Sequence, residues 1–184
     1  SFVGLKNLIK AHDQADAELG PDPAWGRLPK IGMFYDTSTL KWNNRDKPID
    51  LTTLEGREWF YITIRDFFSM VPPRKWARID GKPIVFLYGA NYAAKVDDHL
   101  FDDTRERFQT DFATDLFLVR HHDWPGRADA WYIWGGATGL KIGEHVAALG
   151  PGYDDSAVQG RTPMVVDRQR GAFYDHQWEN LLRI

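Results

Sequence analysis

The residues Gly81-Lys82-Pro83-Ile84-Val85-Phe86-Leu87-Tyr88-Gly89 form a turn, an uninterrupted apolar run and a second glycine. An apolar run of this length between two glycines predicts a strand over residues 84–88 that is buried on both faces. Strands of this kind are typical of parallel sheets, because the connecting helices cover the sheet. The segment therefore favours an α/β fold with a parallel sheet.

Four other segments repeat this pattern, at residues 31–35, 116–120, 130–134 and 146–149, and each ends in polar, aromatic or glycine residues. Amphipathic spacing predicts helices over residues 3–19, 52–70, 97–111 and 173–183. The sequence Thr52-Thr53-Leu54-Glu55 fits a capping box for the second helix, with Phe60, Ile64, Phe67 and Val71 facing the core. Only about ten residues separate the third strand from the fourth and the fourth from the fifth, so we expect those crossovers to lack a full helix.

The composition is that of one globular domain over residues 1–184. With 43% hydrophobic and 27% charged residues, a disordered or fibrous chain is excluded. The net charge is −3 and there is no basic block, so we expect no nucleic-acid partner. No apolar run approaches the roughly 18 residues of a membrane span, so no membrane partner is expected. Because there is no cysteine, disulfides and thiolate chemistry are also excluded.

The side chains at the ends of the five predicted strands are rich in carboxylates and aromatic rings. The carboxyl ends of parallel strands meet at one edge of a sheet, so we expect these side chains to line one rim. Sugars require this mixture, because aromatic faces stack on C–H surfaces while carboxylates bind hydroxyls and move protons. The candidate acid/base residues are Asp36, Asp123 and Asp155. The candidate substrate-binding residues are Tyr35, Tyr88, His121, His122, Trp124, Trp134, Tyr153, Asp154 and Arg168.

Other interpretations of the same residues stay open. The aromatic side chains can equally fill a core, and the aspartates can cap turns. His121 and Asp123 share one face of an extended segment, which allows a metal-assisted hydrolase, although two ligands do not make a metal site. A non-catalytic carbohydrate-binding module on the same scaffold is the third alternative. No phosphate loop and no dinucleotide-binding G-x-G-x-x-G pattern occur, so we expect no cofactor and no resident metal.

Two stretches carry a resemblance to a known family. The first is Ala147-Ala148-Leu149-Gly150-Pro151-Gly152-Tyr153-Asp154-Asp155, and the second is Val166-Asp167-Arg168-Gln169-Arg170-Gly171-Ala172-Phe173-Tyr174 followed by Gln177-Trp178. Together with Lys82–Tyr88, they resemble glycoside hydrolase family 99 and related bacterial domains of unknown function. The resemblance implies an endo-acting α-mannosidase-like protein on a (β/α)8 barrel, with Tyr88 and Tyr153 facing an α-linked glycan.

The resemblance also implies that the chain is a partial barrel. The family's two catalytic glutamates lie in an Asn-Glu-Trp-x-Glu motif on the strand after the Trp-bearing helix, which would follow Ile184. Residues 1–184 would then carry about strands three to seven of eight, and Tyr35-Asp36-Thr37 stands where the family has a Glu-Pro-Tyr type sequence. Such a piece leaves sheet edges open, so we expect it to associate when expressed alone. For the full-length protein we expect a secreted or periplasmic location.

Overall fold

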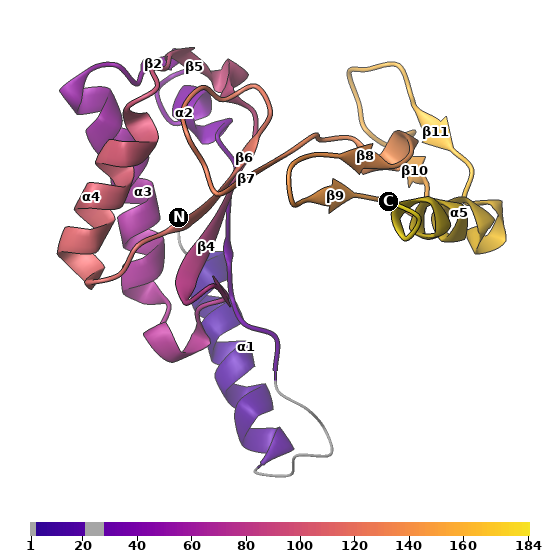
Figure 1. Cartoon of the computed structure of the whole chain (residues 1–184), viewed down its shortest axis with the longest axis horizontal. Helices are drawn as coiled ribbons and strands as arrows, with labels where there is room; N and C mark the ends of the chain where they lie inside the picture. Colours follow the sequence, from indigo (N-terminus) through magenta and orange to yellow (C-terminus); the bar gives the residue numbers. More distant parts are fainter. Residues whose placement is uncertain (1–2, 21–27) are drawn as a thin grey trace.

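The computed structural model describes residues 3–20 and 28–184. At its centre is a parallel sheet of strands β1 (Met33–Tyr35), β4 (Lys82–Leu87), β6 (Phe117–His121) and β7 (Ala130–Tyr132), in that spatial order. A short strand β3 (Arg78–Ile79) pairs antiparallel with β4 through the turn at Gly81. Neighbouring strands therefore follow the order of the chain, and the predicted parallel α/β sheet is confirmed for four of its five strands (Figure 1).

Helices α1 (Val3–Leu19), α3 (Leu54–Met70) and α4 (Leu100–Phe112) pack on one face of this sheet (Figure 1). Phe60 and Ile64 of α3 and Phe108 of α4 are fully buried there, against Val85 and Leu118 of the sheet. Each such side chain contributes roughly 1.5–3 kcal/mol by leaving water. This helix-covered face is the main core, and the packing of its buried side chains fixes the positions of the strand ends.

The start of α3 differs by one residue from the predicted capping box. Thr53 is the N-cap, and its hydroxyl accepts a hydrogen bond from the Gly56 N–H at 3.0 Å. The preceding Thr52 instead donates its hydroxyl to the Asp50 carboxylate at 2.6 Å. Because Thr52 is engaged in this turn, Thr53 is the residue whose side chain caps the helix. A capping role for Thr52 with Glu55 is therefore wrong, although the helix itself is confirmed.

The opposite face of the sheet is largely open. Strand β1 alternates, with Met33 and Tyr35 buried while Phe34 is 50% exposed. A second, smaller core of Ile84, Val119, Ala130 and Tyr132 covers only part of this face. The prediction that residues 31–35 are buried on both faces is therefore wrong, because the described helices that pack on the sheet cover its other side.

The C-terminal segment turns back on itself instead of extending the sheet. Strands β8 (Lys141–Ile142) and β9 (Ala147–Ala148) form one antiparallel ribbon, and β10 (Tyr153–Asp154) and β11 (Val165–Val166) form another. The prediction of a fifth parallel strand at 146–149 is wrong, because Ala147 and Ala148 pair antiparallel with β8 and not with β7. A single antiparallel bridge from Trp131 to Glu144 joins this segment to β7.

Helix α5 (Ala172–Leu181) follows the two ribbons and lies beside them (Figure 1). Phe173 and Leu181 of the predicted helix are half-buried, while Trp178 is 41% and Leu182 81% exposed. The helix is also held by Gln177, whose side-chain amide exchanges two hydrogen bonds with the backbone of Gly150.

The remaining described elements are short. Helix α2 (Thr39–Trp42) follows β1, and β2 (Ile49–Asp50) pairs in parallel with β5 (Ala93–Lys95). No helix among the described residues combines the length and apolar character needed to cross a membrane.

Candidate functional site

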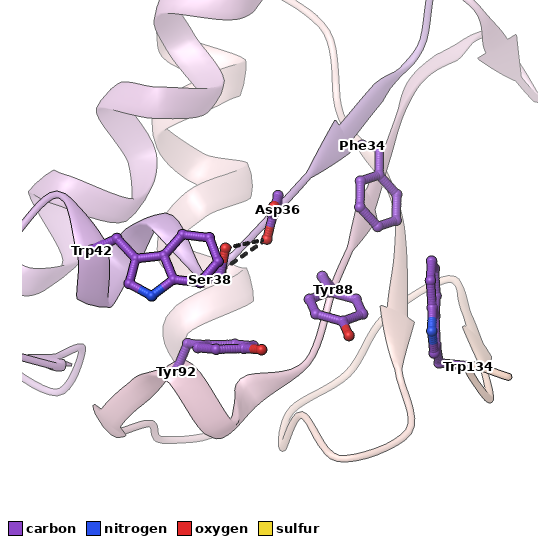
Figure 2. Close-up of a pocket in the computed structure, with 7 residues that line it drawn as sticks. All are labelled: Phe34, Asp36, Ser38, Trp42, Tyr88, Tyr92 and Trp134. Carbon is purple, nitrogen blue, oxygen red and sulfur yellow. Dashed lines mark hydrogen bonds between the residues drawn. The ribbon is translucent and has the colours of Figure 1, made fainter. Parts of the chain in front are cut away.

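An aromatic pocket lies at the carboxyl ends of the parallel strands (Figure 2). Its volume is about 280 Å³, and we call it the rim pocket. The lining residues follow or belong to β1, β4 and β7 and the short helices beside them: Phe34, Asp36, Ser38, Trp42, Tyr88, Tyr92 and Trp134. The strand ends therefore bring three predicted site residues together, namely Asp36, Tyr88 and Trp134.

Tyr88 is the central ring of the rim pocket. Its ring meets Trp134 edge-on at 5.0 Å between centroids and stacks on Tyr92 at 6.0 Å. Figure 2 shows Trp42 and Trp134 at opposite ends of the pocket, with the two tyrosines between them. Trp42 is 60% and Trp134 55% exposed, so large aromatic surfaces face solvent at both ends.

Asp36 supplies the carboxylate of this pocket. Its Oδ1 atom accepts hydrogen bonds from the Ser38 hydroxyl at 2.6 Å and the Ser38 N–H at 3.1 Å. The neighbouring Thr37 hydroxyl donates to the Gly89 carbonyl at 2.6 Å, which ties the end of β1 to the end of β4. Both contacts fix the position of the carboxylate relative to Tyr88.

The electrostatics of the rim keep Tyr88 protonated. Burial raises the pKa of its phenol, and the neighbouring Tyr92 phenol, where ionised, and the carboxylates of Asp36 and Asp123 raise it further. The hydroxyl therefore carries its proton at neutral pH and can donate a hydrogen bond to a ligand.

His121 and Asp123 form a hydrogen-bonded dyad next to the rim pocket. His121 Nδ1 lies 2.7 Å from Asp123 Oδ1, and Asp123 Oδ2 accepts the Ala90 N–H at 3.0 Å. The exposed ring of His122 lies 4.3 Å from that of His121. The dyad thus joins the end of β6 to the residues that follow β4.

Tyr35 and Trp124, two of the predicted substrate-binding residues, lie in the core and do not line the rim pocket. Strand alternation turns Tyr35 toward the helices, where it is 3% exposed and packs on Phe60. Trp124 is 1% exposed, lies between Phe60 and Phe101, and donates its indole N–H to the Tyr88 carbonyl. It supports the pocket from beneath rather than lining it.

The predicted site residues in the C-terminal segment lie apart from the rim pocket. Asp155 is 5% exposed, accepts the Met164 N–H at 2.6 Å and pairs with Arg161, which also donates to the Tyr153 hydroxyl at 2.9 Å. This arrangement gives Asp155 a structural role in its loop. Asp154 is exposed and accepts the Ser156 N–H at 2.9 Å within its own turn, and Arg168 is exposed.

Tyr153 and Asp155 line a second, larger cleft of about 670 Å³ between the C-terminal segment and the open face of the sheet. Phe34 and Trp134 border both this cleft and the rim pocket. The two hollows are therefore contiguous through these two rings.

A model of the family described as "Domain of unknown function (DUF5010)" matches residues 2–183 of the chain. The chain belongs to the DUF5010 family. Neither a curated protein nor a solved structure matches it. Because the DUF5010 match names no glycosidase, the resemblance to glycoside hydrolase family 99 stays a prediction.

A metal centre at His121 and Asp123 would need further ligands in this DUF5010 domain. Within residues 3–20 and 28–184, no three His, Asp or Glu side chains gather closely enough to hold an ion. His121 Nδ1 and Asp123 Oδ1 also bond each other. The geometry favours a hydrogen-bonding role for the pair over the metal alternative.

Sequence reasoning missed four residues of the rim pocket in this DUF5010 domain, which are Phe34, Ser38, Trp42 and Tyr92. Trp42 and Tyr92 lie outside every predicted strand and helix, and Tyr92 follows the end of β4 by only a few residues. A signal existed for these two, since each lies in a short helical turn just after a strand end, where parallel sheets place their binding residues.

Proposed function

We propose that this DUF5010 chain is a glycoside hydrolase-like domain whose rim pocket holds a sugar ring of an α-linked glycan or polysaccharide. The observation that carries the proposal is the set of five aromatic side chains around the Asp36 carboxylate at the carboxyl ends of parallel strands. Rings offer flat apolar surface to sugar C–H groups, while Asp36 and the Tyr88 hydroxyl offer an acceptor and a donor to sugar hydroxyls. A location outside the cytoplasm, secreted or periplasmic, goes with this substrate class.

We further propose that the sheet is an arc of a (β/α)8 barrel. Two observations support this. The strands follow one another in chain order, and the helices that pack on the sheet lie on one face. In such barrels the helices form the outer layer, and apolar side chains fill the interior. The open face with Phe34, Phe86 and Tyr132 would then be the barrel interior.

Hydrolysis of a glycosidic bond normally uses two carboxylates, about 5–5.5 Å apart in retaining enzymes and about 6.5–9.5 Å apart in inverting ones. Asp36 is the carboxylate that lines the rim pocket. In the proposal it orients or assists, and a glutamate that the family resemblance places after residue 184 supplies acid/base chemistry. Residues 1–184 alone should therefore bind the glycan without cleaving it.

Titration with α-linked oligosaccharides, monitored by tryptophan fluorescence, tests the binding. Trp134→Ala should weaken binding roughly tenfold, equal to about 1.4 kcal/mol, because it removes the exposed ring at one end of the pocket. Trp178→Ala is the matched control, since Trp178 is similarly exposed but lies on α5. Equal losses in both variants, or no binding by the unmodified chain, would contradict the proposal.

A second candidate is a non-catalytic carbohydrate-binding module. One observation favours it: both oxygens of Asp123 and Oδ1 of Asp36 already accept hydrogen bonds from neighbouring residues. Carboxylates held in this way suit binding better than proton transfer. Product analysis with the full-length natural protein separates the two candidates, since a glycoside hydrolase releases reducing ends and a binding module does not.

A further inference from the structure

A further inference concerns the dyad of His121 and Asp123. It rests on the proposed sugar binding and goes beyond it. We propose that Asp123 is a positioning residue, not an acid or base, and that it holds His121 in one tautomer whose Nε2 atom accepts a hydrogen bond from a ligand hydroxyl.

The proton on His121 follows from the chemistry of its partner. An ionised carboxylate accepts hydrogen bonds and donates none, so the 2.7 Å contact requires the proton to be on His121 Nδ1. In the neutral ring the other nitrogen, Nε2, must then be an acceptor. Within residues 3–20 and 28–184, Nε2 of His121 makes no hydrogen bond to the protein, so it is available.

Asp123 is fully occupied in this arrangement. Oδ1 faces the His121 ring, and Oδ2 accepts the Ala90 N–H at 3.0 Å, where the chain leaves β4. A carboxylate whose two oxygens are both engaged is poorly placed to exchange a proton with a substrate. It is well placed to orient a histidine. Carboxylates that accept a hydrogen bond from a metal-binding or catalytic histidine do the same in other proteins.

The backbone around the dyad is held by further contacts. The His122 N–H donates to the Tyr132 carbonyl at 2.9 Å, and the Trp124 N–H donates to the His121 carbonyl at 3.2 Å. The Arg120 guanidinium donates to the His122 carbonyl at 3.0 Å. Because the turn is fixed on both sides, the imidazole keeps one orientation and loses little freedom when a ligand binds.

The position of the dyad fits a ligand in the rim pocket. His121 ends β6 at the same edge of the sheet at which Tyr88 follows β4, and its side chain is 15% exposed. The Tyr88 hydroxyl donates and the His121 Nε2 atom accepts, so together they match a sugar ring that carries several hydroxyls.

Imidazole nitrogen NMR on the folded chain reads the tautomer directly and needs no sugar. At a pH where His121 is neutral, the Nδ1–H tautomer is expected in the unmodified chain and in Asp123→Asn, whose amide oxygen still accepts. Asp123→Ala should lose this preference. An Nε2–H tautomer in the unmodified chain would overturn the proposal.

Sugar titration then tests the role of Nε2. His121→Phe, which keeps a ring but removes the acceptor, and Asp123→Ala should each weaken binding about fivefold or more. Asp123→Asn should lose less, and Asp154→Ala is the control for a removed surface carboxylate. Unchanged affinity in His121→Phe would overturn the ligand role. If the unmodified chain binds no sugar, the proposed function fails, and the tautomer signal alone decides the positioning role of Asp123.

Discussion

Replacing Trp124 by phenylalanine tests the support beneath the rim pocket. Trp124 is 1% exposed, packs between Phe60 and Phe101, and donates its indole N–H to the Tyr88 carbonyl. Phenylalanine keeps most of the apolar contact but cannot donate. The partly buried carbonyl of Tyr88 then loses its side-chain donor, at the residue whose ring is the centre of the pocket.

The magnitude follows from two contributions. A buried acceptor left without its partner costs about 1–3 kcal/mol, and the missing ring atoms leave a small cavity that costs roughly 1 kcal/mol more. We therefore expect Trp124→Phe to lower the free energy of unfolding by about 2–4 kcal/mol. For a chain of this size that corresponds to a fall in Tm on the order of 5–12 °C.

Urea unfolding and sugar titration of the same samples provide the assay. Sugar affinity should fall only about threefold in Trp124→Phe, because the side chain does not line the pocket. The control is Trp59→Phe on α3, where the ring is 43% exposed and the change should stay within about 0.5 kcal/mol. The reasoning is refuted if Trp124→Phe leaves stability unchanged while binding falls more than tenfold, since Trp124 would then contact the ligand.

Three further predictions concern stability and association. Burial acts to raise the pKa of Asp129, but hydrogen bonds from the Leu118 N–H and from Arg105, with nearby positive charge, lower it below its usual 3.8. The stability from this group is therefore present above about pH 4 and is lost as pH falls further, so Asp129→Asn should flatten the decline of the urea midpoint below pH 4. Asp155→Ala should destabilise the C-terminal loop by about 2 kcal/mol, seen as faster amide exchange at Met164, because the Met164 N–H and the Arg161 guanidinium both lose their acceptor. Residues 1–184 should self-associate through the open sheet, and Phe34→Lys should shift the sedimentation coefficient toward that of the monomer. An unmodified chain that sediments as a monomer at every concentration would contradict this prediction.

The helices and the central strands could be predicted because their signals are local. The spacing of apolar residues over 3–19 coincides with α1, and the glycine-bounded run at 84–88 overlaps β4. In β4 the apolar run also buries the strand, while in α1 the spaced residues Leu5 and Ile9 are half-buried against the core. The sequence signal that decides which strand a given strand pairs with is not local. Residues 146–149 look like a buried strand of the sheet, but their partner is the neighbouring strand β8, with which they form an antiparallel ribbon.

The site residues that directly follow a predicted strand could be predicted from the sequence. Asp36, Tyr88 and Trp134 come together because they follow three parallel strands. Tyr35 and Trp124 look the same in the sequence, but their direction depends on which face the helices cover, which no nearby residue reveals. Trp42 and Tyr92 were missed for the opposite reason, since the short helical turns that carry them have no periodic signal.

The alternation of β1 explains why the pocket forms at this edge. Tyr35 points into the helix-covered core and holds the strand, so Phe34 and Asp36 must point to the open side. Phe34 and Trp134 border both the rim pocket and the larger cleft, so the rim pocket shares its wall with the inner face of the sheet. A group that packs on that face also packs against two rings of the rim pocket. In the barrel that we propose, the groups that close the interior therefore also pack against Phe34 and Trp134 and fix these two rings of the sugar site.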